Sequence, residues 1–171
     1  MPVGSRFDRG PFRFEAAGDG NIEDGGGSGV GKLNYTHMTL WAENTEGMHN
    51  LFKMSSLASM EGLYSKWPRI DRDLLERYGK GIMATTGCPS GEVQKWLSAG
   101  RYDRAVQAAA DYRDILGKDN FFVEVMDHGL EIETRVQKDL IRLAKELGIP
   151  LVATNDLHYV NASDAAAHDA L

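Results

Sequence analysis

The sequence is poor in cysteine, in positive charge and in long apolar runs, and each shortage excludes a class of protein. Cys88 is the only cysteine among 171 residues, so no disulfide can form within the chain and a reducing compartment is expected. The net charge of −6 argues against a broad basic phosphate-binding surface, although nucleic acid could still be held locally through metals. No apolar run approaches the length of a membrane span, and no signal-peptide core opens the chain. We therefore expect a cytoplasmic protein with no membrane partner.

The remaining composition is that of one ordinary globular domain. With 42% hydrophobic and 26% charged residues, the chain is long enough to bury a core. Residues 18–31 are rich in glycine and aspartate and predict a flexible surface loop. A phosphate-binding role for these glycines is disfavoured, because no Gly-Lys-Ser/Thr sequence ends the run and no strand precedes it.

After this loop, predicted strands alternate with predicted helices. Alternating or continuous apolar runs predict strands at 33–41, 82–86, 121–126 and 151–154. Helical spacing and end signals predict helices after Asn44, from Asp71 or Asp73 to Gly79, after Ser90, at 102–116, at 132–147 and after Ser163. This order favours an α/β fold of parallel βα units, either a doubly wound sheet or a barrel. Four strands are too few to close a barrel, so we expect the chain to be incomplete.

Side chains able to carry chemistry follow the predicted strands. Asp156 and His158 leave the last strand two residues apart, so both point to the same side and suit a divalent metal. Cys88 follows the second predicted strand, His128 follows the third, and His37 lies inside the first. Because α/β folds build sites at the carboxyl ends of their strands, we expect these residues to share a cavity. Mixed nitrogen, sulfur and oxygen ligands favour Zn²⁺ or Mn²⁺ over Ca²⁺.

Each of these residues also has a structural interpretation. Asp156 could cap a turn beside a surface His158, and Cys88 could be a small buried residue, the usual fate of a free thiol. A histidine within a strand, such as His37, is more often a hydrogen-bonded structural residue than a ligand. His128 could be a ligand, an acid or a turn former. A nucleophilic role for Cys88 would need a base that the sequence does not identify.

Four segments together resemble the polymerase and histidinol phosphatase (PHP) domain at the N-terminus of the alpha subunit of bacterial DNA polymerase III. They are Asn34–Asn44, Thr85–Glu92, Glu124–Gly129 and Ala153–Val160, and they occur in the family's order. The Gly-rich insertion and the cysteine-bearing segment are most similar to the actinobacterial type. The resemblance implies a distorted (β/α)7 barrel with a cluster of divalent metals, zinc, manganese or magnesium, at the carboxyl ends of its strands.

The resemblance also implies roles for individual residues. His37, Cys88, Asp156 and His158 match metal ligands of the family; Asp156, His158 and His128 would be the catalytic residues, with His128 beside the metals. Metal-competent members are 3′–5′ exonucleases that proofread DNA, which implies phosphodiester hydrolysis by metal-activated water. The parent protein would then be a DNA-directed DNA polymerase. Its partners would be the primer 3′ end and other subunits of the DNA polymerase III holoenzyme.

The chain departs from the family at both ends. The family's opening His-x-His motif would lie before residue 1, and the polymerase regions would follow residue 171. We therefore expect residues 1–171 to be the C-terminal part of a PHP domain, lacking its first strands and inactive alone. A non-catalytic PHP domain that stabilises the polymerase and binds replisome subunits is an alternative, as is an unrelated metal-dependent hydrolase. Retention of ligating residue types at all four positions favours a metal-competent parent.

Overall fold

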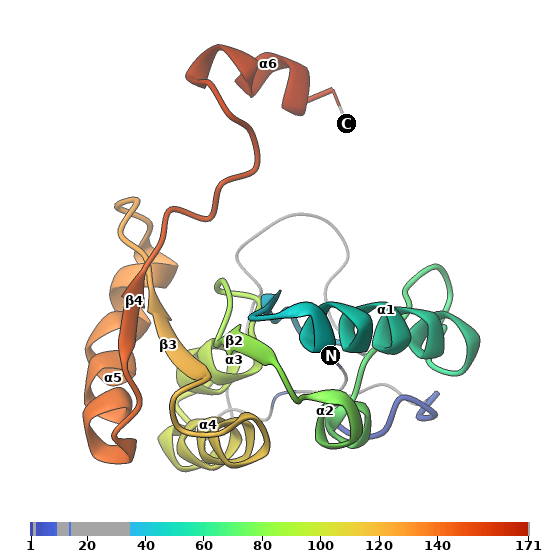
Figure 1. Ribbon diagram of the computed structural model, residues 1–171. Coiled ribbons are helices and arrows are strands. Elements are labelled where there is room, and N and C mark those ends of the chain that lie inside the picture. The colour runs from blue at the N-terminus through green and yellow to red at the C-terminus, as the bar shows by residue number, and fades with distance from the viewer. Residues whose placement is uncertain (2, 10–13, 15–34, 171) are drawn as a thin grey trace.

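The computed structural model describes residues 1, 3–9, 14 and 35–170, so the predicted loop at 18–31 lies outside the described residues. Four strands form one sheet: β1 (Leu40–Ala42), β2 (Ile82–Thr85), β3 (Phe121–Val125) and β4 (Leu151–Ala153). The described helices are α1 (Thr45–Met60), α2 (Arg72–Tyr78), α3 (Glu92–Ser98), α4 (Tyr102–Leu116), α5 (Glu131–Leu147), the 3₁₀ helix η1 (Ala162–Asp164) and α6 (Ala165–His168) (Figure 1). The predicted mixture of strands and helices is confirmed.

The sheet has the strand order β1-β2-β3-β4 and mixed direction. The pairs β2–β3 and β3–β4 are parallel, as predicted for successive βα units. The expectation of parallel strands is wrong for β1, which runs antiparallel to β2 with Trp41 opposite Met83. Two helices, α1 and α2, separate these strands in the sequence, and this longer connection returns the chain in the opposite direction.

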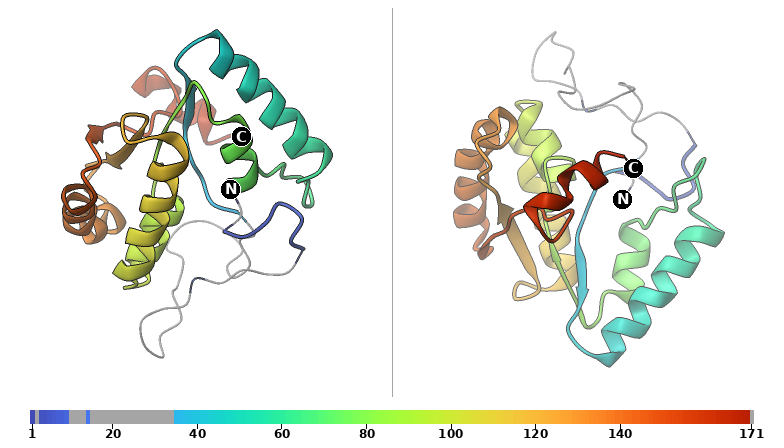
Figure 2. Two further views of the ribbon diagram at one scale, coloured as in Figure 1. Left: turned by 60° about the horizontal axis from the view of Figure 1, so that its bottom comes forward. Right: turned by 90° about the horizontal axis from the view of Figure 1, so that it is seen from above.

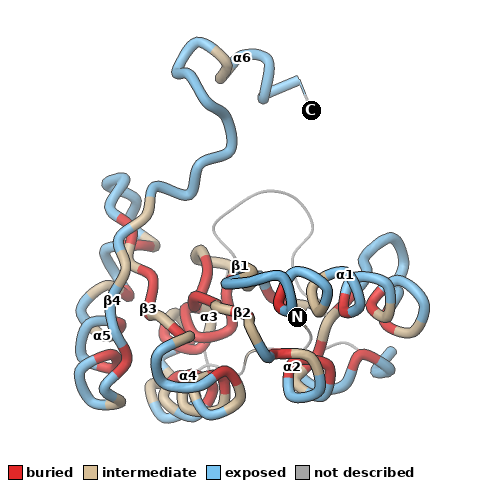
Figure 3. Tube along the Cα trace, in the orientation of Figure 1, coloured by how far each residue is buried: buried red, intermediate tan, exposed pale blue. Residues whose placement is uncertain are grey.

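The helices pack against different strands of the sheet. Helix α1 contacts β1 and β2, whereas α4 contacts β2 and β3 and α5 contacts β3 (Figures 1 and 2). Buried residues concentrate in the central strands and in the inward faces of α3, α4 and α5 (Figure 3). Leu74, Ile82, Phe121, Val123 and Leu143 are each fully buried. Burying each such side chain contributes roughly 1.5–3 kcal/mol, so this core fixes the relative positions of the strand ends.

Several predicted helix ends are confirmed by their capping bonds. The Asn44 side chain accepts a hydrogen bond from the Gly47 amide at 3.0 Å and so begins α1. The Asp71 side chain accepts from the Leu74 amide at 3.2 Å, which makes Asp71 rather than Asp73 the cap of α2. Helix α5 ends at Gly148, whose φ of 66° is the left-handed conformation that glycine adopts without strain.

The predicted cap at Ser90 is wrong, because the N-cap of α3 is Gly91. The Ser90 carbonyl instead accepts the His37 amide at 3.0 Å, and residues 88–91 form a tight turn before the helix. The predicted strand at 33–41 is also too long. Its residues 33 and 34 lie outside the described part, and 35–39 form only a bridge between His37 and Gly91 before β1 begins at Leu40.

The segment after β4 leaves the body of the fold and ends in η1 and α6 (Figures 1 and 2). Almost all of its residues are exposed (Figure 3). Ser163 lies inside η1 and does not cap a helix; Asn161 and Asp164 form a reciprocal capping box around that turn instead. Among the helices of the described residues, none is long and apolar enough to cross a membrane.

Candidate metal-binding site

A cavity of about 430 Å³ lies where the chain leaves β2 and β4, and its wall includes all four residues predicted to bind metal. These are His37 before β1, Cys88 after β2, and Asp156 and His158 after β4. The parallel packing of β2, β3 and β4 brings their carboxyl ends to one edge of the sheet. Residues separated by more than a hundred positions therefore face one space.

The side chains of His37 and Cys88 contact each other in this cavity, with the Cys88 sulfur 3.5 Å from Nδ1 of His37. The His37 backbone is held against the turn after β2 by its bridge to Gly91. Gly87, at φ 79°, lets this approach occur, since a Cβ there would stand 3.2 Å from the His37 carbonyl oxygen. Burial lowers the pKa of the His37 imidazole and raises the pKa of the Cys88 thiol. His37 is thereby kept neutral, the form that binds metal.

Asp156 and His158 lie on the exposed segment directly after β4. Asp156 has a φ of 45°, an uncommon conformation for a residue with a side chain. Nδ1 of His158 lies 2.7 Å from the Asp156 carbonyl oxygen. Because a carbonyl can only accept a hydrogen bond, Nδ1 carries the proton in the neutral ring and Nε2 keeps its lone pair. This is the tautomer of a histidine that binds metal through Nε2.

The donor chemistry of the four residues fits Zn²⁺ or Mn²⁺, with two imidazoles, one thiol and one carboxylate on a single cavity. The four side chains are not all close together. Within the described residues, no three His, Cys, Asp or Glu side chains are grouped closely enough to hold a metal ion. The cavity therefore presents a suitable set of donors without the short mutual distances of a closed metal cage.

His128, predicted as a catalytic residue, is not among the described residues that line this cavity. Its Nδ1 is 2.6 Å from Oε1 of Glu133, and its Nε2 is 2.9 Å from the Asn155 carbonyl oxygen. The hydrogen bond to Glu133 is the main cause that raises the pKa of His128. With a carboxylate on one nitrogen and a carbonyl on the other, both ring nitrogens face acceptors, an arrangement that favours the protonated ring.

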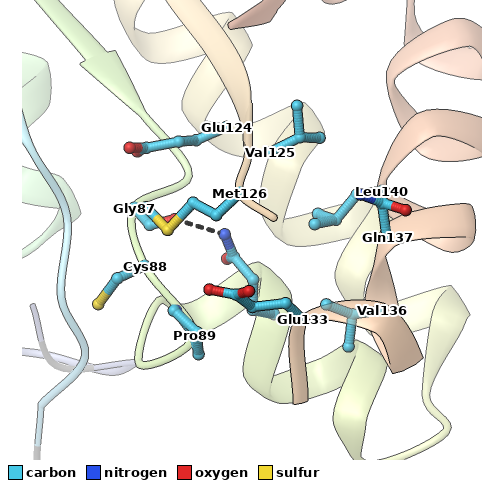
Figure 4. Close-up of a pocket in the computed structure, with 11 residues that line it drawn as sticks. Gly87, Cys88, Pro89, Glu124, Val125, Met126, Glu133, Val136, Gln137 and Leu140 are labelled. Atoms are coloured by element: carbon cyan, nitrogen blue, oxygen red, sulfur yellow. Dashed lines mark hydrogen bonds between the residues drawn. The ribbon is translucent and has the colours of Figure 1, made fainter. Parts of the chain in front are cut away.

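Glu124 lines the same cavity and was missed by the sequence analysis. It is buried near the carboxyl end of β3, where its carboxylate accepts hydrogen bonds from the hydroxyls of Thr85 and Thr154. Figure 4 shows the side chains of Glu124 and Cys88 directed away from α5. Both residues also line a smaller cavity of about 20 Å³. The signal for Glu124 was a single acid inside the apolar run Phe121–Met126; no comparable signal marked Glu133.

These features define an α/β domain with a cavity, at the edge of the sheet where its parallel strands end, lined by side chains of types that can bind metal. Comparison with protein families gives the particular class: the PHP domain model matches residues 6–128. The chain therefore belongs to the PHP domain family. This confirms the resemblance found in the sequence, while Asp156 and His158 lie beyond the matched residues.

Known relatives extend the comparison over the whole chain. The DNA polymerase III subunit alpha of Saccharopolyspora erythraea is 56% identical over 173 residues, which cover 100% of this chain and 14% of that protein. The subunit alpha of Mycobacterium tuberculosis is 50% identical over 168 residues, covering 98% of this chain and 14% of that protein. That of Deinococcus radiodurans is 45% identical, covering 92% of this chain and 12% of that protein. The predicted similarity to the actinobacterial type is confirmed, and the chain spans about a seventh of these relatives.

Proposed function

We propose that residues 1–171 are the later part of a PHP domain in a cytoplasmic replicative DNA polymerase, where they contribute to a metal-dependent 3′–5′ exonuclease site. The substrate would be the phosphodiester at the primer 3′ end, and the partners would be other subunits of the polymerase holoenzyme. The four-stranded sheet would then be one portion of a (β/α)7 barrel. A bound divalent metal would supply an activated water and stabilise charge at the phosphorus.

The observation that carries this proposal is the convergence of His37, Cys88, Asp156 and His158 on one cavity. Four residues from three separate strand ends supply ligating atoms, and the forms of the two imidazoles are compatible with binding. His37 is kept neutral by burial, and the proton of His158 is held on Nδ1. In the proposed site these four side chains bind metal, and further ligands come from parts of the PHP domain outside this chain.

The non-catalytic alternative has an observation in its favour. Among the described residues, no cluster of three ligating side chains is close enough to hold a metal. A PHP domain of this kind would stabilise the polymerase and bind other subunits while its cavity had no hydrolytic role. The two functions differ in what the loss of Asp156 should do.

The test replaces Asp156 by Asn in a complete DNA polymerase III alpha subunit that contains this sequence. We expect Mn²⁺- or Zn²⁺-dependent degradation of a primer 3′ end to fall by at least ~100-fold, because a ligand supplies several kcal/mol through its metal. DNA synthesis by the same preparation reports on folding. Asp169→Asn, an exposed carboxylate in the same C-terminal segment, is the matched control and should change neither activity.

Two results would reject the exonuclease assignment. Undiminished primer degradation in Asp156→Asn would show that this carboxylate is not needed for hydrolysis. An unmodified subunit that never degrades a primer, yet loses polymerase stability or subunit binding when the cavity residues are changed, would favour the non-catalytic domain.

A further inference from the structure

Glu133, in the first turn of α5, forms hydrogen bonds with both the backbone and the ring of His128. Oε1 of Glu133 lies 2.6 Å from Nδ1 of the imidazole, and Oε2 of the same carboxylate accepts the His128 backbone amide at 2.7 Å. Glu133 itself is buried, with its side chain 6% exposed, while the His128 side chain is 34% exposed. The carboxylate therefore fixes both the backbone and the ring of His128, and the ring is aimed by a group that solvent barely reaches.

The other ring nitrogen reaches the chain after β4. Nε2 of His128 donates to the Asn155 carbonyl oxygen at 2.9 Å, across 27 positions of sequence. Asn155 immediately precedes Asp156, whose φ of 45° needs support from its surroundings to persist. The Asp156 carbonyl oxygen in turn accepts a hydrogen bond from Nδ1 of His158 at 2.7 Å. Hydrogen bonds and the short stretch of backbone from Asn155 to Asp156 thus connect buried Glu133 to His158.

We propose that His128 and Glu133 form a clamp whose role is to position residues 155–158 at the cavity, so that His128 is a positioning residue rather than a metal ligand. Both ring nitrogens of His128 are directed at acceptors of the chain in this arrangement, so neither is free to bind a metal. The clamp acts instead on the backbone that carries Asp156 and His158. Its consequence for metal binding rests on the function proposed above, whereas its effect on the loop does not.

The surroundings explain why this loop needs a clamp. The segment after β4 is exposed at nearly every position, including Leu157 at 81%, so little packing holds it in place. Thr154, one residue before Asn155, is tied to buried Glu124 on β3. The His128–Glu133 clamp is the next tie along the segment. Hydrogen bonds that involve charged groups are stronger than neutral ones, which suits a tie that must hold without a hydrophobic core.

The experiment measures loop order and metal binding separately in the complete alpha subunit. His128→Phe keeps a ring of similar size and removes both donors; Glu133→Gln keeps an acceptor and removes the charge. Arg135→Gln is the matched control, because it breaks the exposed ion pair with Glu131 on the same helix. Chymotryptic cleavage within residues 155–159 is followed by mass spectrometry without added metal, and Zn²⁺ and Mn²⁺ dissociation constants are measured by equilibrium titration.

We expect cleavage within residues 155–159 to become about tenfold faster or more in His128→Phe, since a hydrogen bond to a charged group is lost and the segment opens more often. Glu133→Gln should give a smaller change in the same direction, and Arg135→Gln no change. Metal dissociation constants should rise roughly 10–100-fold in His128→Phe, the range found when groups that orient ligands are removed.

An unchanged cleavage rate in His128→Phe would overturn the clamp. If the cleavage rate stays unchanged while metal binding is abolished, His128 would be a ligand and the proposal would be wrong for that reason. If the unmodified subunit binds no metal, the proposed function fails, but the clamp is still judged by cleavage within residues 155–159. Faster cleavage together with unaltered metal affinity would show that the clamp orders the loop without positioning any ligand, which would reject the positioning role.

Discussion

The buried ion pair between Arg72 and Glu92 offers a sharp test of how the helices are held together. The Arg72 guanidinium in α2 donates to both carboxylate oxygens of Glu92 in α3, at 3.1 and 3.2 Å. Tyr112 of α4 donates its hydroxyl to the same carboxylate, and the Arg72 guanidinium lies 4.4 Å from the Tyr112 ring centroid. Burial, with the Glu92 charge nearby, raises the pKa of Tyr112 well above its ordinary value. Three helices therefore meet at one buried carboxylate.

Replacing Arg72 by Met should destabilise the chain by about 3 kcal/mol. Breaking a buried pair by removing one partner costs about 3–5 kcal/mol, because the remaining charge stays buried without compensation. Here the Glu92 side chain is 4% exposed, but the Arg72 side chain is 23% exposed and Tyr112 still donates, which places the cost near the lower limit. Met retains the apolar stem of arginine, so the change reports mainly on charge.

The measurement is urea unfolding of a complete PHP domain that contains this sequence, at neutral pH, followed by tryptophan fluorescence and circular dichroism. The double variant Arg72→Met/Glu92→Gln also removes the unpaired buried charge of Glu92. We expect its free energy of unfolding to be about 1–2 kcal/mol higher than that of Arg72→Met, within the range of measured couplings. A loss below about 1 kcal/mol in Arg72→Met, or strictly additive effects in the double variant, would refute the view that this pair carries buried charge.

Two further predictions test the start of α1 and the His128–Glu133 clamp. Asn44→Ala should lower the free energy of unfolding by about 1 kcal/mol through loss of the bond to the Gly47 amide, whereas Asn44→Ser should retain most of it; equal losses would refute the capping role. Glu133 raises the pKa of His128, so the stability from its charged form is complete below the unfolded value of about 6.5 and is lost as pH rises through the raised folded pKa. Since the pKa of Glu133 is lowered, the stability contributed by its ionised carboxylate is lost in acid. The difference in unfolding midpoint between wild type and His128→Phe should therefore be greatest near pH 5–6. A pH-independent difference would contradict this.

The parts of the fold that the sequence predicted correctly are those governed by local chemistry. Helix α4 has the predicted bounds. Asn44 begins α1, Asp71, one of the two predicted candidates, begins α2, and Gly148 ends α5, because each cap acts within a few residues. The failure at Ser90 has a non-local cause. Its carbonyl is engaged by the amide of His37, a partner 53 positions away that no local pattern could reveal.

In the candidate site, too, the sequence identified residues marked by local pattern and missed those that depend on distant contacts. Residue type and strand position were enough to select Cys88 and Asp156, because ligating side chains after parallel strands gather at one edge. The contribution of Glu133 depends on its distance to His128 and on its burial, and both arise from the docking of α5 on β3. An acid in the first turn of a helix is ordinary, so its sequence position gives no indication of this role.

The place of His37 shows how an incorrect expectation about the fold can still select a cavity residue. The sequence put His37 inside a strand assumed to run parallel to the others, where it would have needed an inward orientation to reach the cavity. In the structure His37 precedes β1, and β1 runs antiparallel to β2. The residue before an antiparallel strand lies at the same edge as the residue after its neighbour, so the reversed direction of β1 is what brings His37 to 3.5 Å from Cys88. The antiparallel pairing of β1 with β2 is therefore a requirement of the proposed site.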